Sequence, residues 1–279
     1  MMIYCFDTSA LNHLHDDPEA ANLTTGLLAT NTVWITALNV IEVGITEDAE
    51  RRNSLLQLQR KLTDNKKPLQ IANRLIRERA AAYAAGLDRA VSSVSEEDGV
   101  WIALNNPQLV DEVLRQELYR WKKELEDDFC QAHEKARPDF QQLFDSGVER
   151  PRTAASLLRH YSRSEDFLFE LTSGIYEEVT GVKLRREELS QFFQAVPQWA
   201  FFCLGWAYAV YARAIRLEKF GRKNAGNIDL WCAAYLPSCD VFITEDFNQY
   251  KALRLINTFN QRRTEVLLYS RLRQRLLIG

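Results

Sequence analysis

Short apolar runs alternate with amphipathic stretches at both ends of the chain. Four runs have the β-prone composition and the length of strands, and the segments between them repeat apolar residues at helical spacing. Because a helical segment separates each strand from the next, we expect the strands to pair in parallel within a layered α/β fold. The predicted strands are Ile3–Phe6, Val33–Thr36, Val241–Thr244 and Val266–Tyr269.

The middle of the chain, residues 66–220, contains no β-branched run of strand length and is predicted to be almost entirely helical. We therefore predict a three-layer α/β/α fold with a central parallel sheet, built from residues 1–65 and 221–279. Residues 66–220 then form a mostly helical insertion packed on that core. Helical spacing is clearest over 37–62, 74–90, 111–135, 152–160, 187–195 and 247–258.

The segment 195–212 carries no charged residue and has to be weighed as a membrane span. It lies at the short end of the ~17–25 residues that a span requires and contains Pro197, so a helix buried in the core is the better prediction. No membrane association is expected. The five cysteines form no CxxC pair, and the N-terminal MMIYCFDTSAL lacks the basic segment of a signal peptide. A reducing, cytoplasmic location is therefore expected.

Four carboxylates lie at the ends of, or within, strands and helices whose other residues are mostly apolar. Asp7 ends the first strand, and Asp246 lies two residues beyond the third. Asp229 lies in the first turn of an apolar helix, where the helix dipole favours the ionised form. Glu42 lies in the helix after the second strand, among apolar neighbours. In an open parallel sheet, ligands bind outside the carboxyl ends of the strands, which is where such residues gather.

No Lys or Arg adjoins Asp7, Glu42 or Asp246 in the sequence. Several buried carboxylates that meet need a counter-charge, and a divalent cation would supply it. All-oxygen ligation indicates Mg²⁺ or Mn²⁺ rather than zinc. Each acid also has a simpler explanation: Asp7 as a helix cap, Asp229 as an ordinary first-turn charge, and Asp246 as part of a turn. Glu42 is the hardest to explain as a solvent-facing residue.

The segments that carry the four acids together resemble the PIN domain family. They read FDTSAL (6–11), ITALNVIEVG (35–44) and GRKNAGNIDLWCAAYLPSCDVFITEDF (221–247). In that family a first strand ends in Asp-Thr-Ser or Asp-Thr-Asn, a Glu lies in the second helix, and D-xx-IAA-A precedes a strand that closes on T-x-D. The resemblance covers less than half of the 279 residues, so a large helical insertion has to be accommodated.

The resemblance implies an α/β/α nuclease that cuts RNA with Mg²⁺ or Mn²⁺ held by Asp7, Glu42, Asp229 and Asp246. Ser9 and Thr244 would be supporting hydroxyl groups. A metal-activated water would attack phosphorus in line and the 3′-oxygen would leave, without a covalent intermediate. Many members of the family are toxins of toxin–antitoxin pairs. The implied partners are an RNA substrate, a protein antitoxin and a second copy of the chain in a homodimer.

A net charge of −3 and a pI near 5.9 do not indicate a broad basic surface, although they allow a local basic patch. Arg222 and Lys223, which lead into Asp229, and Arg254, which follows Asp246, are candidates for phosphate contacts. The arginines of the tail at 271, 273 and 275 are further candidates. For any one of them, a solvated charged face is the simpler explanation.

Two other functions stay open at this point. A HAD-like phosphohydrolase would use Asp7 as a covalent nucleophile, although Ser9 stands where such enzymes have a second acid. A catalytically silent PIN-like module would keep the fold for RNA binding or assembly without cleaving RNA.

Overall fold

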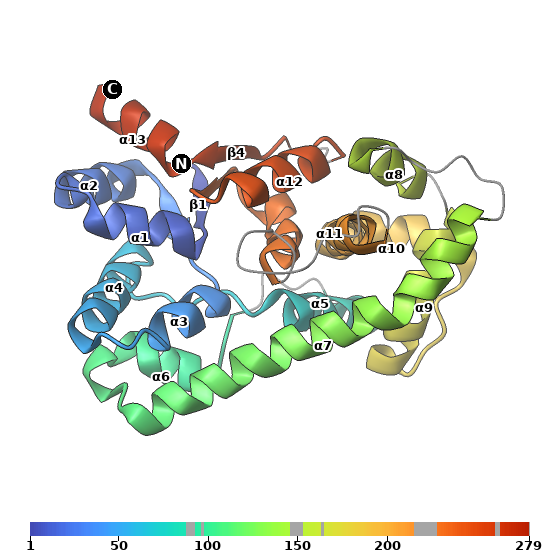
Figure 1. Cartoon of the computed structure of the whole chain (residues 1–279), viewed down its shortest axis with the longest axis horizontal. Coiled ribbons are helices and arrows are strands. Elements are labelled where there is room, and N and C mark those ends of the chain that lie inside the picture. The colour runs from blue at the N-terminus through green and yellow to red at the C-terminus, as the bar shows by residue number, and fades with distance from the viewer. Residues whose placement is uncertain are drawn as a thin grey trace.

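A four-stranded parallel sheet lies at the centre of an α/β fold (Figure 1). The structure is a computed structural model, and it describes residues 1–87, 93–95, 98–145, 153–162, 165–214, 228–259 and 263–278. All four predicted strands are present, with small shifts in the bounds of the second and fourth. They are β1 (Ile3–Phe6), β2 (Thr32–Trp34), β3 (Val241–Thr244) and β4 (Glu265–Leu268).

Helices make up most of the rest of the chain. The first part forms α1 (Thr8–Asp16), α2 (Ala20–Thr30), α3 (Ala37–Gly44) and α4 (Ala49–Leu62). The middle part forms α5 (Ala72–Ala84), α6 (Gly99–Asn105), η1 (Pro107–Leu109), α7 (Glu112–Asp145), α8 (Ala154–Tyr161), α9 (Glu165–Thr180), η2 (Arg186–Glu188), α10 (Leu189–Ala195) and α11 (Pro197–Ala214). The last part forms the 3₁₀ helix η3 (Ile228–Ser238), α12 (Phe247–Asn257) and α13 (Tyr269–Ile278).

The strand order is β2-β1-β3-β4, and each pair of neighbours runs parallel. The chain passes from β1 outward to β2 on one side. It returns to place β3 on the other side of β1, with Tyr4 beside Val241 and Phe6 beside Ile243. The direction in which strands are added therefore reverses between β1 and β3. This junction is the topological switch point, where open α/β sheets bind their ligands.

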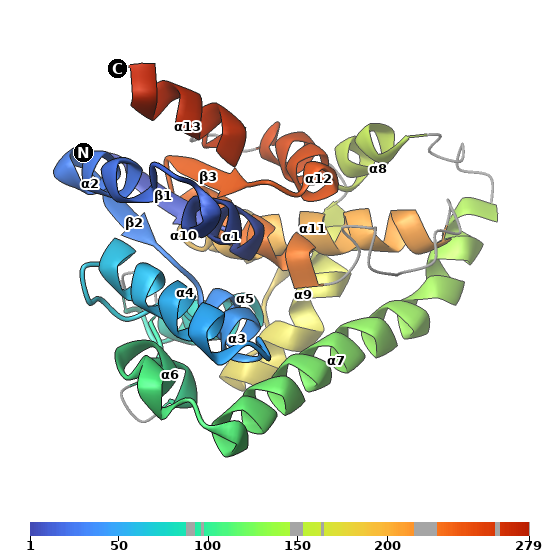
Figure 2. The same ribbon diagram turned by 60° about the vertical axis from the view of Figure 1, so that its left-hand side comes forward.

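The sheet is buried on both faces, as expected for parallel strands. Alternate side chains enter two hydrophobic clusters: Cys5 and Phe242 enter one, and Phe6 and Ile243 enter the other. The cluster of Cys5 draws on α5, α10, α11, η3 and α12, and the cluster of Phe6 draws on α1, α2, α3, α4, α6 and α13. The architecture is therefore a three-layer α/β/α sandwich, and Figure 2 shows helices on both sides of the strands.

The helical region 66–220 shares this core. Phe192 and Trp199 lie in the same buried cluster as Cys5 and Phe242 of the sheet. The uncharged segment predicted to be a buried helix forms most of α11, whose Trp199 is 1% exposed. Within the described ranges, no helix has both the length and the apolar character needed to cross a membrane.

The longest helix, α7, runs from α6 across the molecule and beneath α5 in the view of Figure 1. It contacts α3, α6, η3 and α11 on its way. One helix of the middle region thus lies against elements that follow β2 and precede β3. This arrangement allows α7 to contribute side chains to a site formed mainly by the two ends of the chain.

Candidate functional site

Two of the predicted acids lie side by side at the switch point. Asp7 follows β1 directly, and Asp246 follows β3 after Glu245. The backbone N–H of Asp7 donates to the carbonyl of Ile243 at 2.8 Å. This bond continues the pairing of β1 and β3 to the carboxyl ends of the two strands. The sheet itself therefore fixes the relative positions of these acids.

Ser9 and Thr244 join the two acids through their hydroxyl groups. The Ser9 hydroxyl donates to Asp7 Oδ2 at 2.7 Å and lies 3.1 Å from the hydroxyl of Thr244. Both hydroxyls accept hydrogen bonds from the backbone N–H of Asp246, at 3.2 and 3.0 Å. Residues from opposite ends of the sequence are thus connected by one continuous network.

Both acids also cap helices, which was the simpler explanation for Asp7. Asp7 Oδ2 accepts from the N–H of Ser9 at the start of α1. Asp246 Oδ1 accepts from the N–H groups of Asn248 and Gln249 at the start of α12, at 2.7 and 2.8 Å. Each cap uses one carboxylate oxygen, so capping leaves the second oxygen of each acid for another role.

Asp229 lies in the first turn of η3 and is repelled electrostatically by the other three acids. Burial raises its pKa well above the ordinary value, and the charges of Asp7, Glu42 and Asp246 raise it further. Burial and the three like charges therefore act against the ionised form, which the helix dipole was expected to favour. The same interactions indicate that all four acids gather around one region of the molecule.

Close packing of η3 on α11 sets the position of Asp229. A Cβ atom added to Gly205 of α11 would lie 2.5 Å from the carbonyl oxygen of Leu230. Only glycine allows the two backbones to approach so closely. Since Leu230 follows Asp229 directly, the depth of this acid in the protein depends on Gly205.

Glu42 has a partner that the sequence analysis did not find. Lys122 Nζ of α7 lies 3.4 Å from Glu42 Oε1, and the two side chains are 26% and 20% exposed. Burial raises the pKa of Glu42, as does Asp7, while Lys122 acts to lower it. Burial lowers the pKa of Lys122, but Glu42, Glu126 and Asp229 outweigh this effect and raise it. An ammonium group is therefore part of the acidic site.

Two glycines allow side chains of α7 to pack closely, so that Lys122 faces Glu42. A Cβ atom at Gly44 would lie 2.5 Å from Leu118 Cδ1, and one at Gly99 would lie 3.1 Å from the ring of Trp121. A larger residue at Gly44 would force the end of the Leu118 side chain to move, and one at Gly99 would crowd the Trp121 ring. Gly44 lies two residues after Glu42 in α3, so this packing sets the register of Lys122 directly.

Gln249 connects three of the four acids and is buried at 1% exposure. Its Nε2 lies 3.4 Å from Asp7 Oδ1 and 3.3 Å from the carbonyl oxygen of Asp229, and its backbone N–H binds Asp246. Both partners of Nε2 are acceptors, so the amide cannot be turned over without loss. Gln249 Oε1 consequently stays buried without a hydrogen-bond partner. Such an acceptor suits a cation or an ordered water.

The predicted basic residues have different outcomes. Arg222 and Lys223 lie outside the described residues. Arg254 is exposed on α12, and its guanidinium donates to the hydroxyl of Tyr250 at 2.8 Å. In the tail, Arg273 pairs with Asp17 and Arg275 pairs with Glu265, so these two arginines hold α13 and β4 in place.

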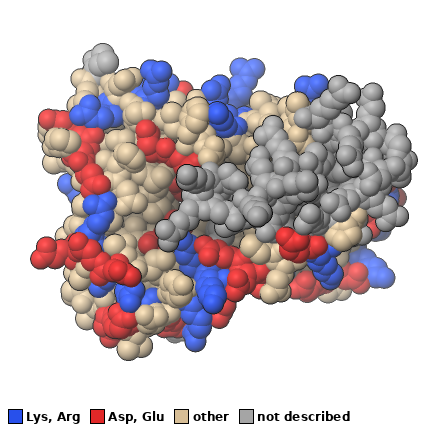
Figure 3. Space-filling view, in the orientation of Figure 1, with Lys and Arg blue, Asp and Glu red and all other residues tan. Residues whose placement is uncertain are grey.

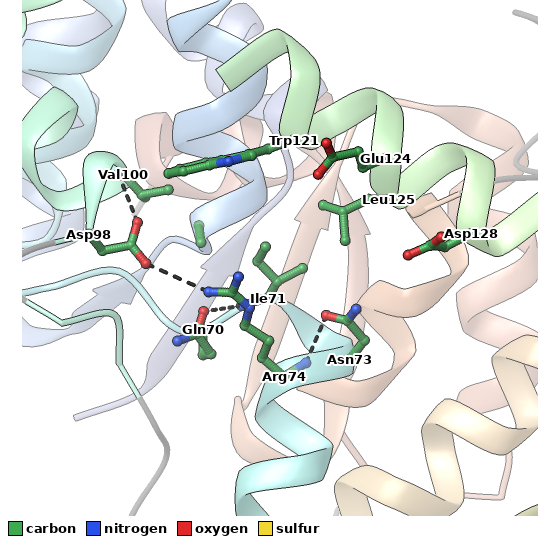
Figure 4. A pocket seen from close by; sticks show the side chains of 11 residues that line it. Gln70, Ile71, Asn73, Arg74, Asp98, Val100, Trp121, Glu124, Leu125 and Asp128 are labelled. Carbon is green, nitrogen blue, oxygen red and sulfur yellow. Dashed lines mark hydrogen bonds and ion pairs between the residues drawn. The ribbon is translucent and has the colours of Figure 1, made fainter. Parts of the chain in front are cut away.

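A polar cavity of about 220 Å³ lies between α5, α6 and α7, away from the four acids (Figure 4). Figure 4 shows the guanidinium of Arg74 reaching toward Asp98, with Trp121 above, and this ion pair spans 3.9 Å. None of the four acids lines this cavity. Two helices reach both places: α7, where Trp121 precedes Lys122, and α3, whose first residue Ala37 lines the cavity and which carries Glu42.

As they stand, no three Asp, Glu, His or Cys side chains in the described ranges form a group that could hold a metal ion. The donor chemistry nevertheless fits a hard divalent cation, because it offers carboxylate oxygens and the orphaned Gln249 Oε1. Binding would need carboxylates to rotate, and Glu42 would have to release Lys122. Comparison of the chain with protein-family models, curated proteins and solved structures finds no significant match.

Proposed function

We propose that this chain is a divalent-metal-dependent ribonuclease of the PIN type, which hydrolyses RNA phosphodiester bonds in the cytoplasm. The observation that carries the proposal is the convergence of Asp7, Glu42 and Asp246 on Asp229 at the switch point of a parallel sheet. Asp7 is buried and the other three acids are partly buried, and like charges held together in this way destabilise a fold. A site that keeps four of them is best explained by a positively charged ligand.

Asp7, Asp229 and Asp246 would hold Mg²⁺ or Mn²⁺, and Glu42 would complete or tune the site. The bound ion would polarise the phosphodiester and make a water molecule acidic enough to attack it. Ser9 and Thr244 hold Asp7 and Asp246 in register through the hydroxyl network. Gln249 keeps Asp7 close to the backbone of Asp229, and its free oxygen would accept a hydrogen bond from water at the site.

The test is cleavage of a labelled single-stranded RNA by the purified chain in EDTA and after addition of Mg²⁺ or Mn²⁺. We expect activity only with added metal. The double variant Asp7→Asn, Asp246→Asn should lose at least about a hundredfold in rate, the scale of a lost group that stabilises the transition state. Asn is as good a helix cap as Asp, so the variant should still fold. Undiminished cleavage by this variant would exclude the mechanism.

A catalytically silent RNA-binding module is the second candidate, and it is favoured by the absence of a ready-made ligand group among the described side chains. The same assay separates the two. A chain that binds RNA and Mn²⁺ but leaves the RNA intact at every metal concentration would be such a module.

A toxin role, with a protein antitoxin and a homodimer, is a narrower form of the proposal and rests on the resemblance alone. Induced expression of the chain in bacteria would test it. Growth arrest by the native chain, but not by the Asp7→Asn, Asp246→Asn variant, is the expected result.

A further inference from the structure

Helix α12 has two faces of opposite character. Its inner face, formed by residues such as Leu253 and Ile256, is buried in the core together with Gln249. Along another side lie the exposed Phe247, Lys251 and Arg254 together with Tyr250, which is partly buried against the core. The four residues follow the i, i+3, i+4, i+7 spacing of a single stripe. In this stripe two aromatic residues are followed by two cations, and we refer to it as the aromatic–cation stripe.

The stripe is ordered by contacts among its own members. The rings of Phe247 and Tyr250 are stacked at 6.2 Å between centroids and 17° between planes. Lys251 Nζ lies 4.1 Å from the centroid of the Phe247 ring, and the guanidinium carbon of Arg254 lies 5.3 Å from that of Tyr250. Phe247 is nevertheless 55% exposed.

The stripe starts at the acidic site. Asp246 is the N-cap of α12, so Phe247 is the next residue after one of the four acids. From there the stripe extends over eight residues, 247–254, or about 10 Å along the helix. Basic side chains also gather on the surface above α12 and α13 in the orientation of Figure 1, as Figure 3 shows. A negatively charged strand that enters the acidic site would be drawn along this face.

We propose that the aromatic–cation stripe is the single-stranded RNA platform of this protein, on which a base stacks against Phe247 while Lys251 and Arg254 contact phosphates. Single-stranded nucleic acids are bound by this combination, because every base has a face for stacking and every linkage carries a charge. The identification of the strand as substrate rests on the proposed ribonuclease function, whereas strand binding itself does not.

The proposal is tested by fluorescence anisotropy with a labelled single-stranded RNA in EDTA, where no cleavage is expected. Phe247→Ala should weaken binding roughly 5- to 150-fold, the equivalent of losing one stacked base, and Phe247→Trp should restore it. Lys251→Gln and Arg254→Gln should each reduce the slope of log K against log salt by about 0.7. An RNA that carries 2-aminopurine should lose fluorescence on binding the native chain but not the Phe247→Ala variant.

Tyr119→Ala is the matched control, because Tyr119 of α7 is 53% exposed and lies outside the stripe. It should leave RNA binding and quenching unchanged. Equal binding by the native chain and Phe247→Ala, or an equal loss in Tyr119→Ala, would overturn the platform whether or not the chain cleaves RNA. Native binding that depends on Phe247, without cleavage in Mn²⁺, would support the platform and refute the ribonuclease function.

Discussion

At the scale of single residues, the acidic site is a group of charges that the fold brings together at a cost. Asp229 shows this most clearly, because burial and three neighbouring acids raise its pKa. The ionised form of Asp229 therefore destabilises the metal-free protein, since an unfolded chain would solvate it freely. Stability and metal binding should respond in opposite directions when this charge is removed.

Asp229→Asn should leave the metal-free protein as stable as the native chain or more stable by about 1 kcal/mol, because Asn is neutral and of similar shape. The same variant should lose the stabilisation that Mn²⁺ gives the native chain, which is about 2.7 kcal/mol at a hundred times Kd. In the native chain this stabilisation is seen as a rise in melting temperature. Thermal unfolding in EDTA and in Mn²⁺ measures both effects. A large loss of stability in EDTA would show that Asp229 is a structural residue.

Lys122 partly balances the acids and would compete with a cation for Glu42. Lys122→Met should lower the free energy of unfolding in EDTA by about 2 kcal/mol, since a partly buried carboxylate loses its partner. It should also tighten Mn²⁺ binding up to about tenfold, measured by titration calorimetry.

The neighbouring Lys123 is exposed on the same helix, so Lys123→Met is the control and should change neither quantity. Unchanged or weaker Mn²⁺ binding in Lys122→Met would show that this ammonium does not compete for the acidic site.

The sequence was sufficient to find the four acids but not their closest partners. Asp7 and Asp246 could be found because they end strands whose composition is distinctive. Lys122 lies eighty residues from Glu42 beside an equivalent Lys123, and only the packing of α7 distinguishes the two. Gln249 did leave a signal, because it is a polar residue on the apolar face of α12.

At the scale of elements, the four strands and most helical segments were predictable, whereas helix ends depend on caps and on tertiary contacts, and η3 was not predicted to be a 3₁₀ helix. The helical pattern over 37–62 is divided into α3 and α4 because Asp48 caps the second helix by accepting from the N–H groups of Glu50 and Arg51. Helix α7 was expected to end near 135, and it continues through the exposed Pro138 to Asp145. One lost hydrogen bond was not enough to stop it.

The contact between α11 and η3 can be tested at Gly205. Gly205→Ala forces the backbone of η3 to move, so it should cost about 1–3 kcal/mol of stability and reduce metal-dependent cleavage together. Urea unfolding and the RNA cleavage assay provide the two measurements.

Gly174→Ala is the control, because a Cβ atom at this exposed position of α9 would meet nothing within 4 Å. It should raise stability by up to about 1 kcal/mol, the gain of Ala over Gly in a helix. A Gly205→Ala variant that behaves in the same way would show that the close approach is not needed.

Asp17, at the end of α1, anchors α13. Its carboxylate accepts from Arg273 at 2.5 Å and from Tyr269 at 2.8 Å, and its side chain is 5% exposed. Burial alone would raise its pKa, but hydrogen bonds from Arg273, the Glu19 N–H and Tyr269 outweigh burial and lower it. The resulting stability is present above the pKa of the unfolded chain, near 3.9, and is lost as the pH falls through the lower folded value.

Asp17→Asn should therefore reduce the free energy of unfolding by about 1–3 kcal/mol at pH 7. The difference from the native chain should shrink as the pH falls below about 4, where the native carboxylate also becomes protonated. Urea unfolding at a series of pH values measures this. A difference that is the same at pH 7 and pH 3 would show that the charge of Asp17 does not matter.

At the scale of the whole molecule, the middle of the chain and its two ends share one hydrophobic core. Cys5 of β1, Phe192 of α10 and Phe242 of β3 belong to the same buried cluster. We expect heat to unfold the chain in a single transition, seen as coincident curves by near-ultraviolet and far-ultraviolet circular dichroism. Two separated transitions would mean that the residues 66–220 form an independent unit.

The hydroxyl pair of Ser9 and Thr244 joins positions 235 residues apart. A ribosome that has made only the first half of this protein has exposed Asp7 without the strand that completes its surroundings, because β3 does not yet exist. If the chain is the ribonuclease proposed above, it would stay inert throughout most of its own translation. The messenger RNA that encodes it would thereby be protected from its product until the last part of the chain has been synthesised.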